Sequence, residues 1–130
     1  MSVRNGEAYD RNNIFAKILR GEIPAKKLFE NDFALAFFDI NPQAPVHVLV
    51  IPKGEYVSLA DFSAEAPAAL VEGFWRAVGE VARQLGLEEG GYRVLVNAGI
   101  NGHQEVPHLH AHIFGGRPLG AMLSRSDAGA

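Results

Sequence analysis

The sequence predicts a single domain that contains both strands and helices, because several strand patterns accompany one long helical pattern. Three of the five histidines, His108, His110 and His112, alternate with apolar residues, and such alternation is typical of a strand with one buried face. Between residues 63 and 85, apolar side chains recur at three- and four-residue spacing, which indicates the main helix. With 130 residues, 48% of them hydrophobic, the chain is long enough for one core.

The first half of the chain predicts a short helix and three strands. Residues 1–12 are polar and lack periodicity, so we expect a flexible N-terminal tail before a domain at 13–130. Asn13 can cap a short helix, and Gly21 suits its left-handed end. Strands are expected next, at residues 26–30, 33–38 and 46–51.

The second half predicts the main helix and two more strands. We expect the helix to begin at Ser63, to run to about Leu85, and to carry Trp75 beside its apolar stripe. A fourth strand is expected at residues 92–96, and a fifth contains the histidines. Between these strands, glycines at 99 and 102 allow backbone amides to face an anion. Residues 117–130 are expected to form an arm.

Composition excludes several classes of protein. The net charge is -3, which argues against a surface that binds nucleic acid. The chain has no cysteine, so it forms neither a disulfide framework nor a thiolate metal site. No apolar run approaches the length that spans a membrane, and we expect a soluble, cytoplasmic protein.

The histidine row is compatible with two chemistries. Neutral imidazole is a common metal ligand, but the outer two α-carbons of the row lie about 13 Å apart at about 3.3 Å per residue. One ion therefore could bind two of the histidines and a distant ligand, but not all three. The other chemistry is nucleophilic catalysis, in which one imidazole attacks while its neighbours orient it and bind the developing charge.

Two further residues are open to a structural or a functional interpretation. His47 shares a strand face with Leu49 and Ile51, so we expect it to be half buried and to need a hydrogen-bond partner. Asp39 stands where a strand meets a loop that contains two prolines. Such a carboxylate either satisfies local amides or binds a ligand.

The chain resembles the histidine triad (HIT) family of nucleotide hydrolases and transferases. Residues 108–114, His-Leu-His-Ala-His-Ile-Phe, match its histidine-x-histidine-x-histidine-x-x signature, with apolar residues at x. The Hint branch of the family is similar over roughly residues 13–120. Segments that carry this similarity are 14–26, 37–53 and 92–116. The resemblance implies an α+β fold with one main and one short helix and a five-stranded antiparallel sheet, which dimerises into a ten-stranded sheet.

The resemblance also implies roles for individual residues. His110 matches the nucleophile that forms a nucleotidyl-histidine, His112 the residue on the phosphate or leaving-group side, and His108 the residue that orients His110 through its main chain. His47 matches a supporting fourth histidine, and Asp39 the acid that binds the ribose hydroxyls. The walls around the base match Ile14, Phe15, Ile18, Phe37, Phe38, Ile40 and Leu49. The phosphate-side contacts match Asn97, Gln104 and the amide of Val106, and Glu105 stands where animal members have a serine.

The implied activity is hydrolysis of purine nucleoside phosphoramidates, without a metal or another cofactor. The alternatives are a dinucleoside polyphosphate hydrolase, a nucleotide-binding regulatory module with little turnover, and a zinc protein. A homodimer is also expected from the residues themselves. Strand 92–96 would otherwise present unpaired backbone groups at a sheet edge, and the helix around Trp75 carries more apolar surface than one small sheet needs.

Overall fold

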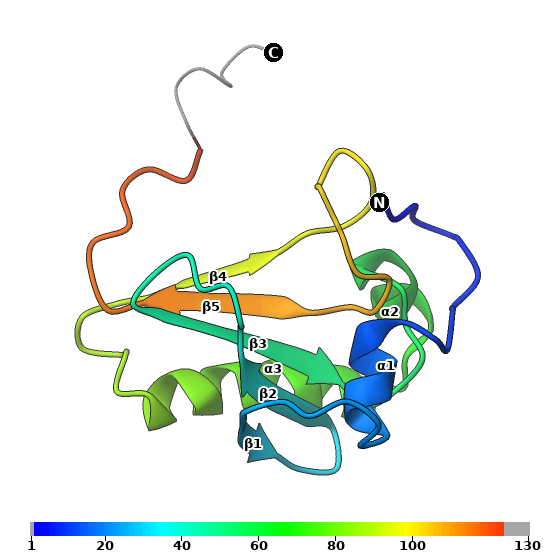
Figure 1. Ribbon diagram of the computed structural model, residues 1–130, viewed down its shortest axis with the longest axis horizontal. Helices are drawn as coiled ribbons and strands as arrows, with labels where there is room; N and C mark the ends of the chain where they lie inside the picture. Colours follow the sequence, from blue (N-terminus) through cyan, green and yellow to red (C-terminus); the bar gives the residue numbers. More distant parts are fainter. Residues whose placement is uncertain (1, 124–130) are drawn as a thin grey trace.

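The computed structural model describes residues 2–123, so the last seven residues of the expected domain and arm lie outside the described part. A five-stranded sheet forms the centre of the molecule (Figure 1). In chain order, the elements are α1 (Ile14–Leu19), β1 (Lys27–Glu30), β2 (Ala34–Phe38), β3 (Val46–Pro52), α2 (Leu59–Glu65), α3 (Ala68–Gln84), β4 (Arg93–Val96) and β5 (Ala111–Gly115). The strand order is β1-β2-β3-β5-β4, and every neighbouring pair is antiparallel. The predicted fold class is confirmed.

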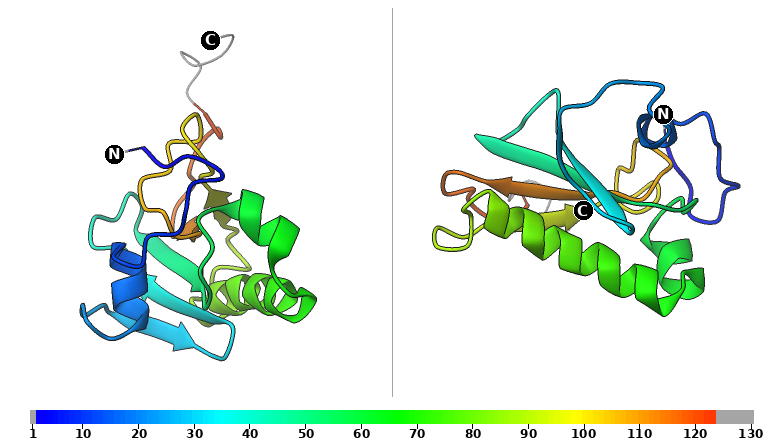
Figure 2. Two further views of the ribbon diagram at one scale, coloured as in Figure 1. Left: turned by 90° about the vertical axis from the view of Figure 1, so that its right-hand side faces the viewer. Right: turned by 90° about the horizontal axis from the view of Figure 1, so that it is seen from below.

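Both faces of the sheet are covered, because strands β2 and β3 are apolar at nearly every position. Helix α3 packs on one face and α1 lies on the other (Figure 2). Val48 and Val50 belong to the core under α3, whereas Leu49 and Ile51 belong to the core under α1. This alternation follows from the two-residue period of a strand. His47 therefore lies on the α1 face, as its shared parity with Leu49 predicts.

The helical region after β3 differs from the prediction of one helix beginning at Ser63. Ser58 and Asp61 form a capping box that starts α2 four residues earlier. Pro67 then separates α2 from α3, because a proline has no N–H to continue the first helix. The capping box and the proline are both visible in the sequence. The prediction missed the break because it followed the apolar spacing, which continues across both helices.

The N-terminal residues also differ from the expected tail, since several of them pack against the domain. Val3 is 3% exposed, and its amide donates to the carbonyl of Gln104 at 3.2 Å. The side-chain oxygen of Asn5 accepts a hydrogen bond from the Ser58 hydroxyl at 2.8 Å. These contacts join residues far apart in the chain, so no local sequence pattern predicts them. Within residues 2–123, no helix is long and apolar enough to cross a membrane.

We predict that Gly73→Ala destabilises the protein although Gly73 lies within a helix. A Cβ at this position would lie 2.3 Å from Cγ and 2.8 Å from Cβ of Phe33, so the aromatic side chain must move. The expected loss is about 1–3 kcal/mol in the free energy of unfolding, measured with urea. Gly79→Ala in the same helix is the matched control. Its new Cβ meets nothing closer than 3.8 Å, and we expect a gain of up to about 1 kcal/mol.

Candidate active site

The histidine row lies at the start of β5 and alternates as predicted. Leu109, Ala111 and Ile113 are fully buried in the core under α3. His110 and His112 face the opposite side, toward α1. The hydrogen-bonded strand itself begins only at Ala111. Before it, the chain is held by a bond from the amide of Leu109 to the carbonyl of Tyr56 at 2.9 Å.

His108 is fully buried and has a partner on each ring nitrogen. Nε2 lies 3.0 Å from the carbonyl oxygen of Pro52, which can only accept, so Nε2 carries the proton. Nδ1 lies 2.6 Å from the hydroxyl of Tyr9 and accepts its hydrogen bond. Burial lowers the pKa of His108 to about 4, so the ring is neutral near pH 7.

His110 is oriented by the main chain of His108. Its Nδ1 lies 2.8 Å from the carbonyl oxygen of His108 and donates to it. In neutral His110, the free lone pair is therefore on Nε2. Burial lowers the pKa of His110, and the ring of Phe15 packs edge-to-face on it at 5.0 Å. The side chain has the protonation and orientation that a nucleophile requires.

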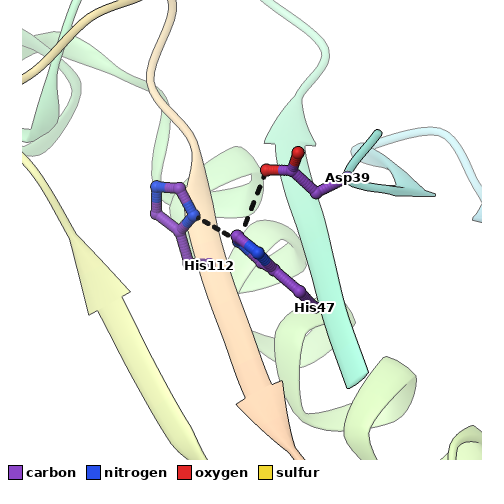
Figure 3. Close-up of side chains that lie close together, drawn as sticks. All are labelled: Asp39, His47 and His112. Atoms are coloured by element: carbon purple, nitrogen blue, oxygen red, sulfur yellow. Dashed lines mark hydrogen bonds and ion pairs between the residues drawn. The ribbon is translucent and has the colours of Figure 1, made fainter. Parts of the chain in front are cut away.

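His47 and His112 form a second hydrogen-bonded chain, which begins at a backbone amide. The amide of Gln43 donates to Nδ1 of His47 at 3.1 Å, so the proton of neutral His47 is on Nε2. That nitrogen lies 2.9 Å from Nδ1 of His112 and 3.4 Å from a carboxylate oxygen of Asp39 (Figure 3). Nδ1 of His112 therefore accepts, and its Nε2 carries the proton. Burial, then the neighbouring His110 and His47, lowers the pKa of His112 to about 4.

The same three side chains could in principle hold a metal ion. The ligand atoms of Asp39, His47 and His112 all lie within 4.8 Å of one another. A neutral histidine that binds a metal through Nε2 must carry its proton on Nδ1, where it usually donates to an oxygen. Nδ1 of His47 instead faces the amide of Gln43, which is itself a donor. The hydrogen bonding therefore favours a network of imidazoles over a metal centre.

A cavity of about 370 Å³ opens beside these histidines. The predicted site residues that line it are Phe15, Asp39, Leu49, Asn97, Glu105, Val106, His110 and His112. Five lining residues were not predicted, namely Asn41, Gln43, Leu95, His103 and Phe114. One of them had a usable signal in the sequence, since Phe114 continues the alternation of the histidine row. Leu95 reaches the site because it pairs with His112 in the neighbouring strand, a register that the sequence does not show.

Several residues predicted as walls of the base site do not line the cavity. Ile40 is 88% exposed and Ile14 is 44% exposed. Ile18 and Phe37 are buried with Phe15 in the core under α1, where they support it. Phe38 is likewise outside the lining; its ring lies 5.2 Å from the ammonium group of Lys26. The cavity wall is therefore narrower than predicted, with Phe15 and Leu49 as its predicted apolar part.

Gln104 is also placed differently from the prediction of a phosphate contact. Its side chain is buried, accepts from the amide of Gly99 at 3.1 Å, and donates to the carbonyls of Val57 and Val106. These bonds shape the loop from 97 to 106 and tie it to Val57, and Gln104 does not line the cavity. Asn97, which lines the cavity, donates from its amide nitrogen to the carbonyl of Gly102 at 2.6 Å.

The charged residues of the cavity are carboxylates. Glu105 lies at the rim, 2.9 Å from Nε2 of His103, and both side chains are mostly exposed. His103 has a φ of 58°, a strained value for a residue with a side chain. Among the cavity-lining residues that the structure describes, Asp39 and Glu105 are acidic and none is lysine or arginine.

Comparison with known proteins defines the class to which this fold and site belong. The HIT domain matches residues 20–119. A HIT-like protein of Azospirillum brasilense is 61% identical over 119 residues, which is 92% of this chain and 98% of that protein. The purine nucleoside phosphoramidase of Escherichia coli K12 is 46% identical over 111 residues, covering 85% and 92% of the two chains.

Solved structures agree with the sequence comparison. A HIT family hydrolase from Clostridium thermocellum has a TM-score of 0.80 at 37% identity, covering 88% of this chain and 99% of that one. A histidine triad protein from Clostridium difficile has a TM-score of 0.76 at 40% identity, with coverages of 88% and 98%. The protein therefore belongs to the HIT domain family, as its sequence motif predicts.

We predict that the buried neutral histidines make stability depend on pH. The pKa of His108 is about 4 in the folded protein and about 6.5 in an unfolded chain. Between these values the unfolded state binds more protons, so stability falls as the pH falls from about 6.5 to about 4. From pH 7 to pH 5, His108 alone accounts for about 2 kcal/mol, and His112 acts in the same direction.

Urea unfolding at the two pH values measures this difference. His112→Gln should show a smaller loss than the unaltered protein, because one of the two imidazoles with a pKa of about 4 is gone. Equal stability at pH 7 and pH 5 would contradict the assignment of these rings as neutral in the folded protein.

Proposed function

We propose that the protein is a metal-independent hydrolase of purine nucleoside phosphoramidates, with His110 as its nucleophile. The observation that carries this proposal is the bond from Nδ1 of His110 to the carbonyl of His108, because it leaves the Nε2 lone pair for attack. Membership of the HIT family supports it, as does the 46% identity to the Escherichia coli purine nucleoside phosphoramidase.

In the proposed first step, Nε2 of His110 attacks phosphorus and the bond from phosphorus to the leaving amine breaks. An amine leaves well only when protonated. A bound phosphoryl anion raises the pKa of the nearby His112, which takes up a proton from solvent at Nδ1. The Nε2–H of His47 then donates to the Asp39 carboxylate, 3.4 Å away, and the imidazolium of His112 gives its Nε2 proton to the amine. Water hydrolyses the resulting nucleotidyl-histidine in the second step, returns a proton to His112, and releases the nucleoside monophosphate.

The remaining cavity residues suit a nucleotide. We assign Asp39 to the ribose hydroxyls, because a carboxylate accepts such hydrogen bonds more strongly than a neutral group. One carboxylate oxygen of Asp39 lies near His47. The other accepts a hydrogen bond from the amide of Asn41 at 2.8 Å, which fixes the orientation of the carboxylate. Phe15 and Leu49 provide an apolar wall for a purine ring. The amide of Val106 and the side chain of Asn97 are assigned to the phosphate side.

The charge of the cavity favours phosphoramidates over dinucleoside polyphosphates. A nucleoside phosphoramidate is a monoester with one negative charge at the scissile phosphorus, whereas a polyphosphate bridge carries several. Proteins that bind polyphosphates place lysine, arginine or Mg²⁺ against the chain. The described lining of this cavity contains two carboxylates and neither lysine nor arginine. These carboxylates would repel a polyphosphate leaving group, so its binding is disfavoured.

Turnover of an adenosine phosphoramidate and of a diadenosine polyphosphate tests this proposal. We expect kcat/KM to be at least about tenfold higher for the phosphoramidate, equivalent to about 1.4 kcal/mol. His110→Ala should lower kcat by about a thousandfold or more, since it removes the nucleophile. The variant should still bind AMP, because Asp39 and the apolar wall are retained.

Mass spectrometry of rapidly quenched reactions should find a nucleotide adduct on the peptide containing His110. A protein that binds AMP but turns over neither substrate would instead be a regulatory module. Near-normal turnover by His110→Ala would exclude His110 as the covalent residue.

We also propose that the protein is a homodimer that joins two sheets through β4. This strand is at the sheet edge. Val94 within it is 38% exposed, and Tyr92 just before it is 39% exposed. An apolar edge strand invites pairing with another strand, and a two-fold axis lets β4 pair with its own copy. Trp75 on α3 is 38% exposed and adds apolar surface.

We predict that Val94→Lys dissociates the dimer, because it places a charge within the paired edge. Light scattering at micromolar concentration should give the dimer mass for the unaltered protein and the monomer mass for the variant. Ile100→Lys is the matched control, since Ile100 is also exposed, at 51%, but lies in a loop. If the unaltered protein were a stable monomer with full activity, the proposal of a dimer would be wrong.

A further inference from the structure

The N-terminal segment of residues 3–9 lies outside the part of the chain that matches the HIT domain, yet it reaches the histidine row. Tyr9 is the residue of this segment that makes the contact. Its hydroxyl lies 2.6 Å from Nδ1 of His108, and its ring meets the imidazole edge-on at 5.6 Å. The HIT domain match begins at residue 20, so this contact is an addition to the matched domain.

The Tyr9 hydroxyl completes the hydrogen bonding of His108. With Nε2 committed to the Pro52 carbonyl, Nδ1 is an acceptor inside a residue that is 0% exposed. A buried acceptor without a donor costs free energy and is rare. Tyr9 supplies that donor, so the ring is held at both nitrogens and in one neutral form.

The position of His108 matters because its carbonyl oxygen is the acceptor for Nδ1 of His110. We propose that Tyr9 is a positioning residue: its hydroxyl fixes the His108 ring and thereby the carbonyl that keeps the lone pair of His110 on Nε2. The consequence for catalysis rests on the proposed function of His110. The effect on the histidine geometry does not.

The rest of the segment is anchored independently of Tyr9. The amide of Val3 bonds to the carbonyl of Gln104, and the side chain of Asn5 accepts from the Ser58 hydroxyl. After Tyr9, Asn13 caps α1 through a bond from the amide of Ala16 at 2.9 Å, which places Phe15 against His110. The Tyr9 hydroxyl also meets the side chain of Asn13, but the bonds of Val3 and Asn5 keep the segment attached when this hydroxyl is removed.

Tyr9→Phe tests the proposal, with adenosine phosphoramidate as substrate and AMP as ligand. We expect kcat to fall about three- to tenfold while the Kd for AMP changes less than about twofold, because Tyr9 does not line the cavity. In proton NMR spectra of the unaltered protein, the Nδ1 proton of His110 should exchange slowly with water. In Tyr9→Phe it should exchange faster, and the ¹⁵N resonance of His108 Nδ1 should shift.

Asn5→Ala is the matched control, because it removes a contact of the same segment that does not reach His108. It should retain kcat and the slow exchange of the His110 proton, even if both variants lose thermal stability. An equal loss of kcat in Asn5→Ala and Tyr9→Phe would overturn the proposal, since packing of the segment would then suffice. Unchanged kcat and exchange in Tyr9→Phe would also overturn it.

Two measurements keep the test independent of folding and of the proposed function. Nitrogen-15 spectra of the unaltered protein report the His108 tautomer directly, and a proton on Nδ1 would overturn the proposal without any variant. If the unaltered protein turns over no phosphoramidate, the proposed function fails. The exchange of the His110 proton still decides the role of Tyr9 in that case.

Discussion

The candidate site depends on one constraint: a neutral imidazole has one proton, and a backbone group decides which nitrogen carries it. The carbonyl of Pro52 places the proton of His108, the carbonyl of His108 places that of His110, and the amide of Gln43 places that of His47. Because Nε2 of His47 then donates to Nδ1 of His112, the proton of neutral His112 is fixed on its Nε2. A lone pair on His110 and a proton on His112 face the same cavity.

The sheet supplies these backbone groups at the required places. Strand β3 is central and pairs with both β2 and β5, with Leu49 opposite His112 and His47 opposite Phe114. This register brings His47 beside His112 and puts the end of β3, at Pro52, within reach of His108. A shift by one residue would turn the histidines into the core under α3. Burial of Leu109, Ala111 and Ile113 in that core therefore holds the site as well as the fold.

The sequence predicts the parts of this arrangement that have a local pattern. Alternation places His108, His110 and His112 on one side of the chain, and β-branched residues mark β3. The family resemblance identifies Asp39 and His47 as their neighbours, and the structure places both beside His112. Contacts without a local pattern were not predictable. Tyr9 meets His108 across 99 positions of sequence. Gln104 is polar like a ligand contact, but its side chain holds its own loop together and bonds that loop to Val57.

The pKa shifts show what burial contributes to such a site. At pH 7 an imidazole with the reference pKa of about 6.5 is already about three-quarters neutral. Lowering the pKa of His110 therefore raises the neutral fraction by no more than about a third, too little to account for catalysis. Orientation offers much more, since fixed geometry alone can supply several kcal/mol of a barrier. Burial matters here because His108 is fully buried: water that would otherwise compete for its carbonyl is removed, and that carbonyl determines the orientation and tautomer of His110.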